Sequence, residues 1–170
     1  YDECIKLFHN EKSYRVFERL LETGLLKHLF QQTSNSKFIK KALNNTSERL
    51  KTNRSVTPAF LFSVFLWDSQ NKYFNKFQKR NKSNFVAMNQ ASEEVISRQV
   101  KQVLMPKWLS TRVKDIWMMQ HQLEKCSSKK VNELVANPRF RIAYDFLVLR
   151  SQSINPELRD RAEYWTQIQK

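Results

Sequence analysis

The side chains whose types and spacing point most directly to chemistry in this chain are basic. Four of them occur at positions i, i+4, i+7 and i+8, which share one face of an α-helix: Lys72, Lys76, Lys79 and Arg80. Ammonium and guanidinium groups in such a row can contact successive phosphates of a polyanion. We interpret the row as a polyanion-binding face, with an ordinary solvated helix face as the alternative.

Aromatic residues interleave with this basic row. Tyr73, Phe74 and Phe77 belong to the same stretch, and a partly exposed ring among them could stack on a nucleic-acid base. In the alternative arrangement the rings turn into the hydrophobic core. The row forms a single face only if the helix that begins at Pro58 continues to Phe77 and beyond.

Two arginines fall in the first turn of a helix that Pro138 is expected to open. Positive charge is unfavourable at that position because it opposes the helix dipole. Arg139 and Arg141 are therefore expected to have a compensating partner, either a carboxylate such as Asp145 or a bound phosphate. Of the two, the carboxylate within the chain is favoured.

Further basic residues gather in two other segments. One segment contains Lys37, Lys40, Lys41, Arg49, Lys51 and Arg54, and the other surrounds Pro106 with Lys107, Arg112 and Lys114. From all of these groups, the candidate polyanion-binding residues are Lys72, Lys76, Lys79, Arg80, Lys107, Arg112, Arg139 and Arg141.

Catalytic and metal-binding patterns are missing from the sequence. Phosphate-cradling loops and nucleophile elbows need several glycines, and Gly24 is the only glycine. The adjacent acidic pairs, Asp2/Glu3 and Glu93/Glu94, would diverge by about 100° on a helix, whereas two-metal chemistry requires carboxylates that converge. Neither a catalytic residue, a cofactor nor a metal ligand is therefore expected within this chain.

The cysteines and the apolar runs indicate the cellular compartment of the protein. Cys4 and Cys126 each lie five residues from a histidine, a spacing that puts the side chains on poorly matched helix faces and does not favour zinc. They are interpreted as reduced thiols of a cytoplasmic protein. The longest apolar run, residues 59–67, is far shorter than the roughly 20 residues that cross a bilayer, so no membrane span is expected.

The composition predicts an all-α fold. One glycine and four prolines in 170 residues leave few turn residues for a sheet, and apolar residues recur at helical spacing almost throughout. Thr57 and Pro58 are typical of a helix start, and Gly24 suits the left-handed position after a helix. Phe85 and Trp117 belong to the expected core. We expect about eight helices in an irregular array without a sheet, among them helices over residues 25–30, 36–52, 58–77, 84–104 and 110–126.

The net charge of +14 is distributed unevenly along the chain. Residues 1–35 carry five basic and five acidic side chains, whereas residues 36–82 carry eleven basic and two acidic ones. A concentrated basic segment is typical of a protein that binds a polyanion. Charge alone does not distinguish RNA, DNA and anionic lipid.

Four segments of the sequence carry a recognisable pattern. They are YDECIKLFHNEKSYRVFERLLETGLLKHLF (1–30), TPAFLFSVFLW (57–67), MPKWLSTRVKDIWMMQ (105–120), and NPRFRIAYDFLVLR (137–150) with AEYWTQIQ (162–169). Together the segments span essentially the whole chain. They resemble bacterial poly(A) polymerases, members of the tRNA nucleotidyltransferase/poly(A) polymerase family, and they occur in the family's order. The last two are the most specific, because the related tRNA CCA-adding enzymes lack this signature.

The resemblance implies that residues 1–35 are late neck helices and that residues 36–170 form a helical, RNA-binding body domain. The whole protein would add adenylates from ATP to RNA 3′ ends with two Mg²⁺ ions, in mRNA polyadenylation, RNA processing and decay. Its catalytic head, with a Gly-Ser or Gly-Gly motif and an Asp-x-Asp pair, would lie upstream of Tyr1. No catalytic residue of the family transfers to any position here, so this chain alone is expected to be inactive.

The favoured function is thus a module that holds single-stranded RNA 3′ ends in position for the catalytic head, with RNA-decay or RNA-chaperone proteins as candidate further partners. Three alternatives stay open. The chain could be the body of a tRNA CCA-adding enzyme, or a helical protein-interaction or regulatory domain with a basic surface. It could also be a DNA-binding helix-turn-helix with residues 110–126 as the reading helix.

Overall fold

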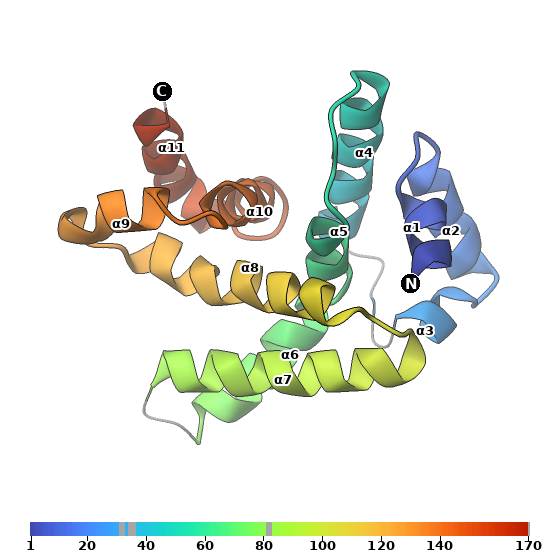
Figure 1. Ribbon diagram of the computed structural model, residues 1–170, viewed down its shortest axis with the longest axis horizontal. Coiled ribbons are helices and arrows are strands. Elements are labelled where there is room, and N and C mark those ends of the chain that lie inside the picture. The colour runs from blue at the N-terminus through green and yellow to red at the C-terminus, as the bar shows by residue number, and fades with distance from the viewer. Residues whose placement is uncertain (31–32, 34–36, 81–82, 170) are drawn as a thin grey trace.

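The computed structural model of the chain describes residues 1–30, 33, 37–80 and 83–169, and within them it contains helices and no strand. The predicted all-α fold is therefore confirmed. The described residues form eleven α-helices and two short 3-10 helices (Figure 1). The α-helices are α1 (Asp2–Phe8), α2 (Ser13–Glu22), α3 (Leu26–Leu29), α4 (Lys37–Lys51), α5 (Pro58–Phe65), α6 (Trp67–Gln78), α7 (Asn84–Gln102), α8 (Lys107–Lys125), α9 (Val131–Val135), α10 (Phe140–Ser153) and α11 (Arg159–Ile168), and the 3-10 helices are η1 (Ser128–Lys130) and η2 (Pro156–Leu158).

The helix count exceeds the expected eight partly because one predicted helix is divided. The helix predicted over residues 58–77 breaks at Leu66, whose φ of −96° and ψ of 1° separate α5 from α6. Hydrogen bonds continue across the break, because the Leu66 amide donates to the Phe62 carbonyl at 3.1 Å and the Gln70 amide donates to the Leu66 carbonyl at 2.9 Å. The direction of the chain changes there while its backbone groups stay paired.

Several predicted helix boundaries are correct and two shift. Pro58 begins α5 after the extended residue Thr57, and Gly24 has a φ of +72° after α2. However, α8 begins at Lys107, three residues before the predicted Ser110. The Pro106 carbonyl accepts hydrogen bonds from the amides of the first turn, so the proline that ends one extended segment also opens the next helix. Likewise, α10 begins at Phe140 and not at Pro138, so Arg139 is its N-cap residue and only Arg141 lies in its first turn.

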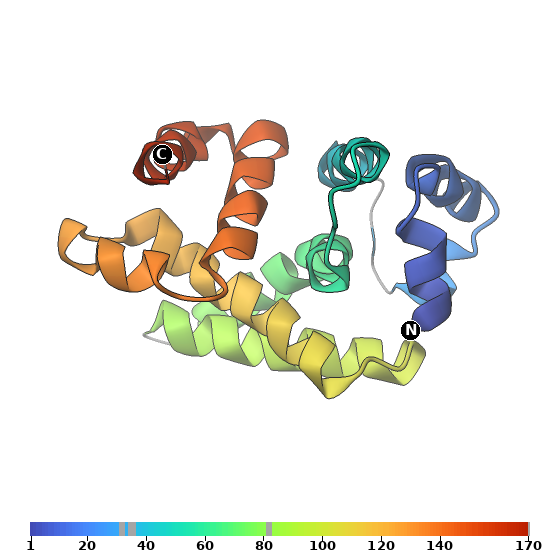
Figure 2. The ribbon, with the colours of Figure 1, turned by 45° about the horizontal axis from the view of Figure 1, so that its top comes forward.

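The helices are arranged around α8. In Figures 1 and 2, α6 and α7 lie below α8, while α4 and α10 lie above it and α1–α3 lie at the N-terminal side. α8 packs against α5, α7 and α10, and its predicted core residue Trp117 is fully buried. The indole Nε1 of Trp117 donates a hydrogen bond to the Ser63 carbonyl on α5 at 3.2 Å. α8 therefore provides the interior surface on which the other helices are placed.

The apolar interior consists of two clusters of buried side chains. The larger cluster joins α1–α8 with α10, and it includes a stacked pair of rings, Phe30 and Phe65, with centroids 4.5 Å apart. The smaller cluster lies between α8, α10 and α11 around Trp165, whose Nε1 donates to the Leu123 carbonyl at 2.9 Å. The predicted boundary between residues 35 and 36 lies outside the described residues, and it stays a prediction.

A buried polar network fixes α10 against α8. Arg150 is only 7% exposed, and its guanidinium donates to the Gln120 side chain at 3.1 Å and to the Glu124 carboxylate at 2.5 Å. The same guanidinium lies over the Trp67 ring of α6 at 4.7 Å. These contacts set the position of α10, which carries Arg141 and Asp145 of the candidate site.

Candidate nucleic-acid interface

The predicted basic row lies on and just after α6. Lys72 and Lys76 belong to α6, Lys79 follows its last residue, and Arg80 comes next, all with exposed side chains. Within the described part of the chain, none of the four side chains forms an ion pair. The row thus presents positive charge to solvent, although α6 and the two residues after it, and not one long helix from Pro58, carry it.

The aromatic residues of α6 are partly buried. The Tyr73 and Phe77 rings stack with centroids 6.2 Å apart, and the Lys76 ammonium lies over Tyr73 at 5.9 Å. Arg98 of α7 lies over the same ring at 5.4 Å. The rings therefore connect α6 to α7 and contact the basic row. Base stacking on these rings stays a prediction.

Phe85 was expected in the core, and this expectation is wrong. It lies in the first turn of α7 and is 60% exposed. The buried face of α7 is formed by residues that include the fully buried Ala87 and Ala91. Phe85 lies roughly 200° around the helix from Ala87, so its ring faces away from that interior.

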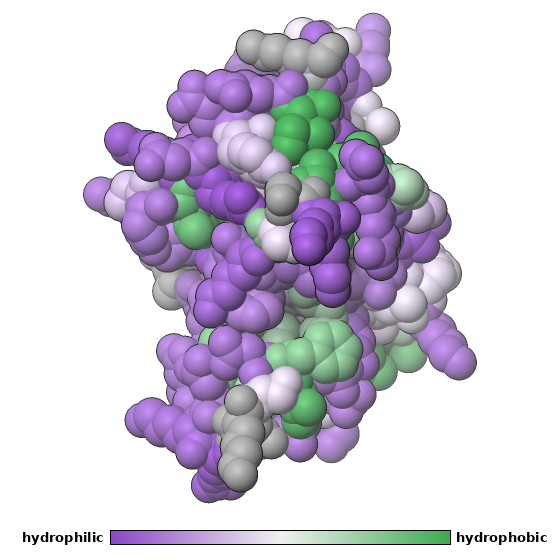
Figure 3. Space-filling model, turned by 90° about the vertical axis from the view of Figure 1, so that its left-hand side faces the viewer, coloured by the Kyte–Doolittle hydropathy of each residue, from purple (hydrophilic) through white to green (hydrophobic). Residues whose placement is uncertain are grey.

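The face seen in Figure 3 is mostly hydrophilic and carries separate hydrophobic patches.

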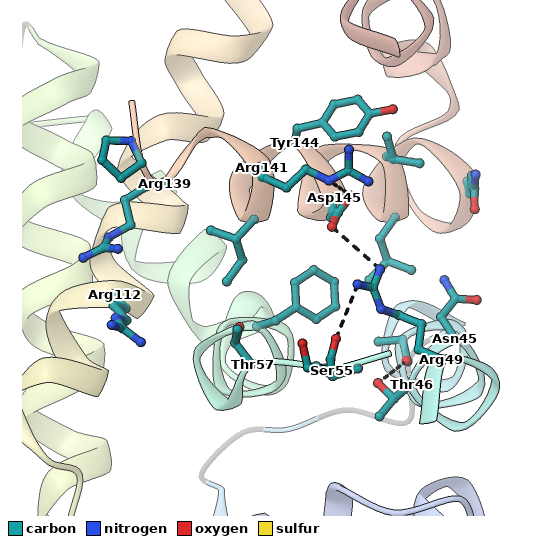
Figure 4. Close-up of a pocket in the computed structure, with 18 residues that line it drawn as sticks. Asn45, Thr46, Arg49, Ser55, Thr57, Arg112, Arg139, Arg141, Tyr144 and Asp145 are labelled. Carbon is teal, nitrogen blue, oxygen red and sulfur yellow. Dashed lines mark hydrogen bonds and ion pairs between the residues drawn. The ribbon is translucent and has the colours of Figure 1, made fainter. Parts of the chain in front are cut away.

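The remaining predicted arginines lie in a different place, at a cleft of about 560 Å³ (Figure 4). Segments from α4, the α4–α5 connection, α5, α8 and α10 line it, and we call it the arginine cleft. Its charged lining residues are four arginines and one aspartate. They are Arg49, Arg112, Arg139, Arg141 and Asp145.

The arginines occupy opposite sides of the arginine cleft. Figure 4 shows Arg112 and Arg139 on one side and Arg141, Asp145 and Arg49 on the other. The Asp145 carboxylate is shared, since it lies 3.4 Å from Arg141 Nε and 3.9 Å from an Arg49 nitrogen. The expected carboxylate partner of Arg141 is therefore confirmed. Both distances exceed the roughly 2.7–2.9 Å of strong charge-assisted hydrogen bonds.

The other two arginines have different neighbours. Arg139 pairs at 3.4 Å with Asp115 of α8, so its partner is not the predicted Asp145. The Arg112 guanidinium lies 5.1 Å above the ring of Trp108, which is 44% exposed. Among the described residues, Arg112 forms no ion pair. The Trp108 ring positions the Arg112 guanidinium, and the N–H donors of that group remain available to a ligand.

The environment of Asp145 is both basic and partly desolvated. Burial raises the pKa of the Asp145 carboxyl above its ordinary value, while the positive charges of Arg141 and Arg49 oppose that rise. The two guanidinium groups are thus paired with a carboxylate whose ionised form is disfavoured by burial. An anionic ligand in the arginine cleft would compete with Asp145 for both arginines.

The structure divides the predicted site residues into two groups. Arg112, Arg139 and Arg141 meet at the arginine cleft, whereas the α6 row lies on the other side of α8 (Figures 1 and 2). Lys107, at the exposed start of α8, belongs neither to the α6 row nor to the lining of the arginine cleft. Sequence reasoning missed Arg49 as a site residue, although it lay within a noted basic segment, because helical spacing does not reveal that α4 faces α10.

Two further properties concern metals and membranes. Across the ranges that the structure describes, no group of three or more His, Cys, Asp or Glu side chains is placed to hold a metal ion. Over the same ranges, no helix has the length and apolar character that crossing a bilayer requires.

Comparison of the sequence with known proteins assigns this chain to a family. A family model described as "Polymerase A arginine-rich C-terminus" matches residues 69–170, and one described as "Probable RNA and SrmB-binding site of polymerase A" matches residues 1–37. Proteins named Poly(A) polymerase I from Salmonella typhimurium and Escherichia coli O6:H1 are 28% and 29% identical over 181 residues. The protein of that name from Haemophilus influenzae is 26% identical over 180 residues.

These similarities cover 99% of this chain and 39% to 40% of the relatives' length. The chain therefore spans about two fifths of the curated relatives that it matches. The arginine-rich model alone covers more than half of the chain, including most of α6, all of α7–α11 and three of the four cleft arginines. The chain belongs to the bacterial poly(A) polymerase family.

Proposed function

We propose that this chain binds single-stranded RNA and positions its 3′ end for adenylate addition by a poly(A) polymerase. The observation that carries the proposal is the exposed row of Lys72, Lys76, Lys79 and Arg80 on a chain whose relatives are named Poly(A) polymerase I. Such a row contacts phosphates irrespective of base sequence, as a tailing enzyme that accepts many RNAs requires.

Holding the RNA accelerates the reaction by bringing two substrates together. A strand fixed along α6 presents its end to the reacting groups at a high effective concentration, which lowers the entropic barrier to transfer. In the whole protein ATP supplies the adenylate, and two Mg²⁺ ions would stabilise the charge that develops during transfer. We assign RNA binding to this chain and propose no catalytic step for its side chains.

The test compares oligo(A) binding by the chain and by its Lys72→Glu/Lys76→Glu/Lys79→Glu variant at several salt concentrations. Fluorescence anisotropy of a labelled oligonucleotide gives the affinity at each concentration. For the variant we expect weaker binding and a log–log salt dependence whose slope falls by about 0.7 for each lost phosphate contact. The three side chains are exposed, so the helical circular dichroism should be retained.

A control with the same change of charge separates local contacts from general electrostatics. Lys125→Glu/Lys129→Glu/Lys130→Glu changes three exposed lysines near the end of α8 and should weaken binding much less. Equal weakening by both variants would mean that overall charge alone attracts the RNA. An unchanged affinity after substitution of the α6 lysines would contradict the proposal.

A second candidate function is protein docking by the N-terminal helices. Residues 1–37 match the model whose description names both RNA and SrmB binding, and residues 1–35 carry no net charge, which favours the protein partner over the polyanion for this segment. Leu25, between α2 and α3, is 52% exposed, which is unusual for a large apolar side chain. We propose that this neutral, partly apolar segment contacts a protein partner, while RNA binds to the basic segment that follows.

Substitution of Leu25 tests this docking surface. Leu25→Asp should weaken binding of purified SrmB at least several-fold, because a charge would be desolvated at the contact. Val135→Asp, a comparable change at a 38% exposed position of α9, is the matched control and should leave binding intact. Equal SrmB binding by all three proteins, measured by surface plasmon resonance, would exclude Leu25 from the contact.

A further inference from the structure

We propose that the arginine cleft is a binding site for one phosphate-bearing nucleotide unit. The cleft is distinct from the α6 row, and its volume of about 560 Å³ lies within the range of about 300–1,000 Å³ typical of small-molecule sites. Four arginines and one aspartate give its lining a strong excess of positive charge. The inference deepens the proposed function and rests on it for the case in which the nucleotide belongs to RNA.

The arginines have donors to spare for a phosphate. Each guanidinium carries five N–H donors in a planar fork that matches phosphate oxygens. Arg141 is 69% exposed and Arg139 is 38% exposed, and both form long ion pairs of 3.4 Å. Arg141 also donates to the Gln169 side chain at 2.9 Å, which occupies one of its five donors. Arg112 is held by the Trp108 ring, with no carboxylate partner among the described residues. A phosphate can therefore approach these groups without breaking a short ion pair.

Asp145 places two of the cleft arginines. It forms ion pairs with Arg141 at 3.4 Å and with Arg49 at 3.9 Å, and Arg49 also donates to the Ser55 carbonyl at 3.4 Å. These contacts hold the guanidinium groups of Arg49 on α4 and Arg141 on α10 together on one side of the arginine cleft (Figure 4). Asp145 is thus a positioning residue, and a bound phosphate would replace part of its interaction with the arginines.

The rest of the lining suits a base and a ribose. Phe60, Ile142 and Val148 provide apolar surface, and Tyr144 adds an aromatic ring whose hydroxyl bonds to Thr166 at 2.7 Å. Polar side chains that can donate to or accept from a base or a ribose hydroxyl also line the cleft. They are Asn45, Ser55, Thr57 and Gln152.

This combination distinguishes a nucleotide from a bare anion. Inorganic phosphate would use the arginines and leave the apolar wall in water, whereas a nucleoside without phosphate would use the wall and leave the arginines unpaired. A nucleoside monophosphate uses both. The same chemistry is offered by one residue of an RNA strand and by a free nucleotide.

The test measures binding of AMP, adenosine and inorganic phosphate to the full chain by isothermal titration calorimetry. We expect AMP to bind more tightly than either of the other two. Arg112→Gln/Arg141→Gln should weaken AMP binding at least tenfold while circular dichroism and thermal unfolding stay close to those of the unmodified chain. Lys129→Gln/Lys130→Gln removes the same charge at exposed positions between α8 and α9 and should leave AMP affinity unchanged.

Two results would overturn the inference. One is an AMP affinity within twofold of the unmodified chain in the double arginine variant. The other is equal binding of AMP and inorganic phosphate, which would leave no role for the apolar wall. A third variant, Arg112→Lys, retains charge without the planar fork and should have an intermediate AMP affinity.

Competition identifies the source of the nucleotide. If AMP displaces oligo(A), the cleft holds one residue of the RNA, and if both bind together, it holds a free nucleotide. The proposed function is tested independently of the cleft. The Lys72→Glu/Lys76→Glu/Lys79→Glu variant should lose binding of oligo(A) and keep binding of AMP. Failure of the unmodified chain to bind oligo(A) would remove the RNA-binding proposal and leave the AMP measurements to decide the cleft.

Discussion

At the scale of single residues, burial separates structural charges from charges that are free to bind. Arg150 is the one charged residue that is almost fully buried among those described, and its donors are directed at Gln120 and Glu124. The cleft arginines and the α6 lysines are far more exposed. The same residue type therefore stabilises the helix packing at one position and is available to a ligand at another.

Replacement of Arg150 by methionine should destabilise the fold. The variant loses the hydrogen bonds to α8 and leaves Glu124 without its partner. We expect a loss of roughly 3 kcal/mol in the free energy of unfolding, at the lower end for a broken buried pair because Glu124 is 25% exposed. Urea denaturation followed by circular dichroism measures this loss.

The control is the same substitution in an exposed pair. Arg19 and Glu22 lie 3.6 Å apart on α2, with side chains 79% and 67% exposed. Arg19→Met should change the free energy of unfolding by less than about 0.5 kcal/mol. Similar losses for Arg19→Met and Arg150→Met would contradict the structural role that we assign to Arg150.

At the scale of elements, local sequence signals located most helices and missed a change of direction. Pro58 and Gly24 act through their own backbone preferences, and both occur where the sequence predicted. The break at Leu66 has no such residue. It follows from tertiary packing, because Phe65 and Trp67 on either side of the break are both buried, and α5 and α6 contact different helices.

Gly24 provides a direct test of an element boundary. Its φ of +72° is unfavourable for a side chain, although an added Cβ would meet no atom within 4 Å. Gly24→Ala should therefore lower the free energy of unfolding by roughly 1 kcal/mol through backbone strain alone. Asparagine tolerates this conformation better, so Gly24→Asn should cost less than Gly24→Ala in urea denaturation. A more stable alanine variant would contradict the strain argument.

At the scale of the whole molecule, α8 and α10 belong to both clusters of the interior and join its parts. The same two helices, with the N-cap residue of α10, supply three of the cleft arginines, so the packing that stabilises the fold also places the arginine cleft. The lysines of α6 lie on the other side of α8 (Figures 1 and 2). The positive charge of the chain is thus presented on two separate surfaces, a row and a cleft.

The sequence by itself determined the all-α class, most helices and the basic character of the chain. These follow from local properties, since glycine scarcity, apolar spacing and side-chain charge need no knowledge of distant contacts. Its resemblance to bacterial poly(A) polymerases also identified the family. The pairing of Arg141 with Asp145 was predictable for the same reason, because the two residues lie one turn apart on one helix.

Only the tertiary structure decided which basic residues share a site. Arg49 lies 96 positions before Asp145 in the sequence, and helical periodicity carries no information about the crossing of α4 and α10. The pairing of Arg139 with Asp115, the exposure of Phe85 and the burial of Arg150 likewise depend on which helix covers which face. Contacts between distant segments are set by the packing of the whole interior, and one segment's pattern does not encode them.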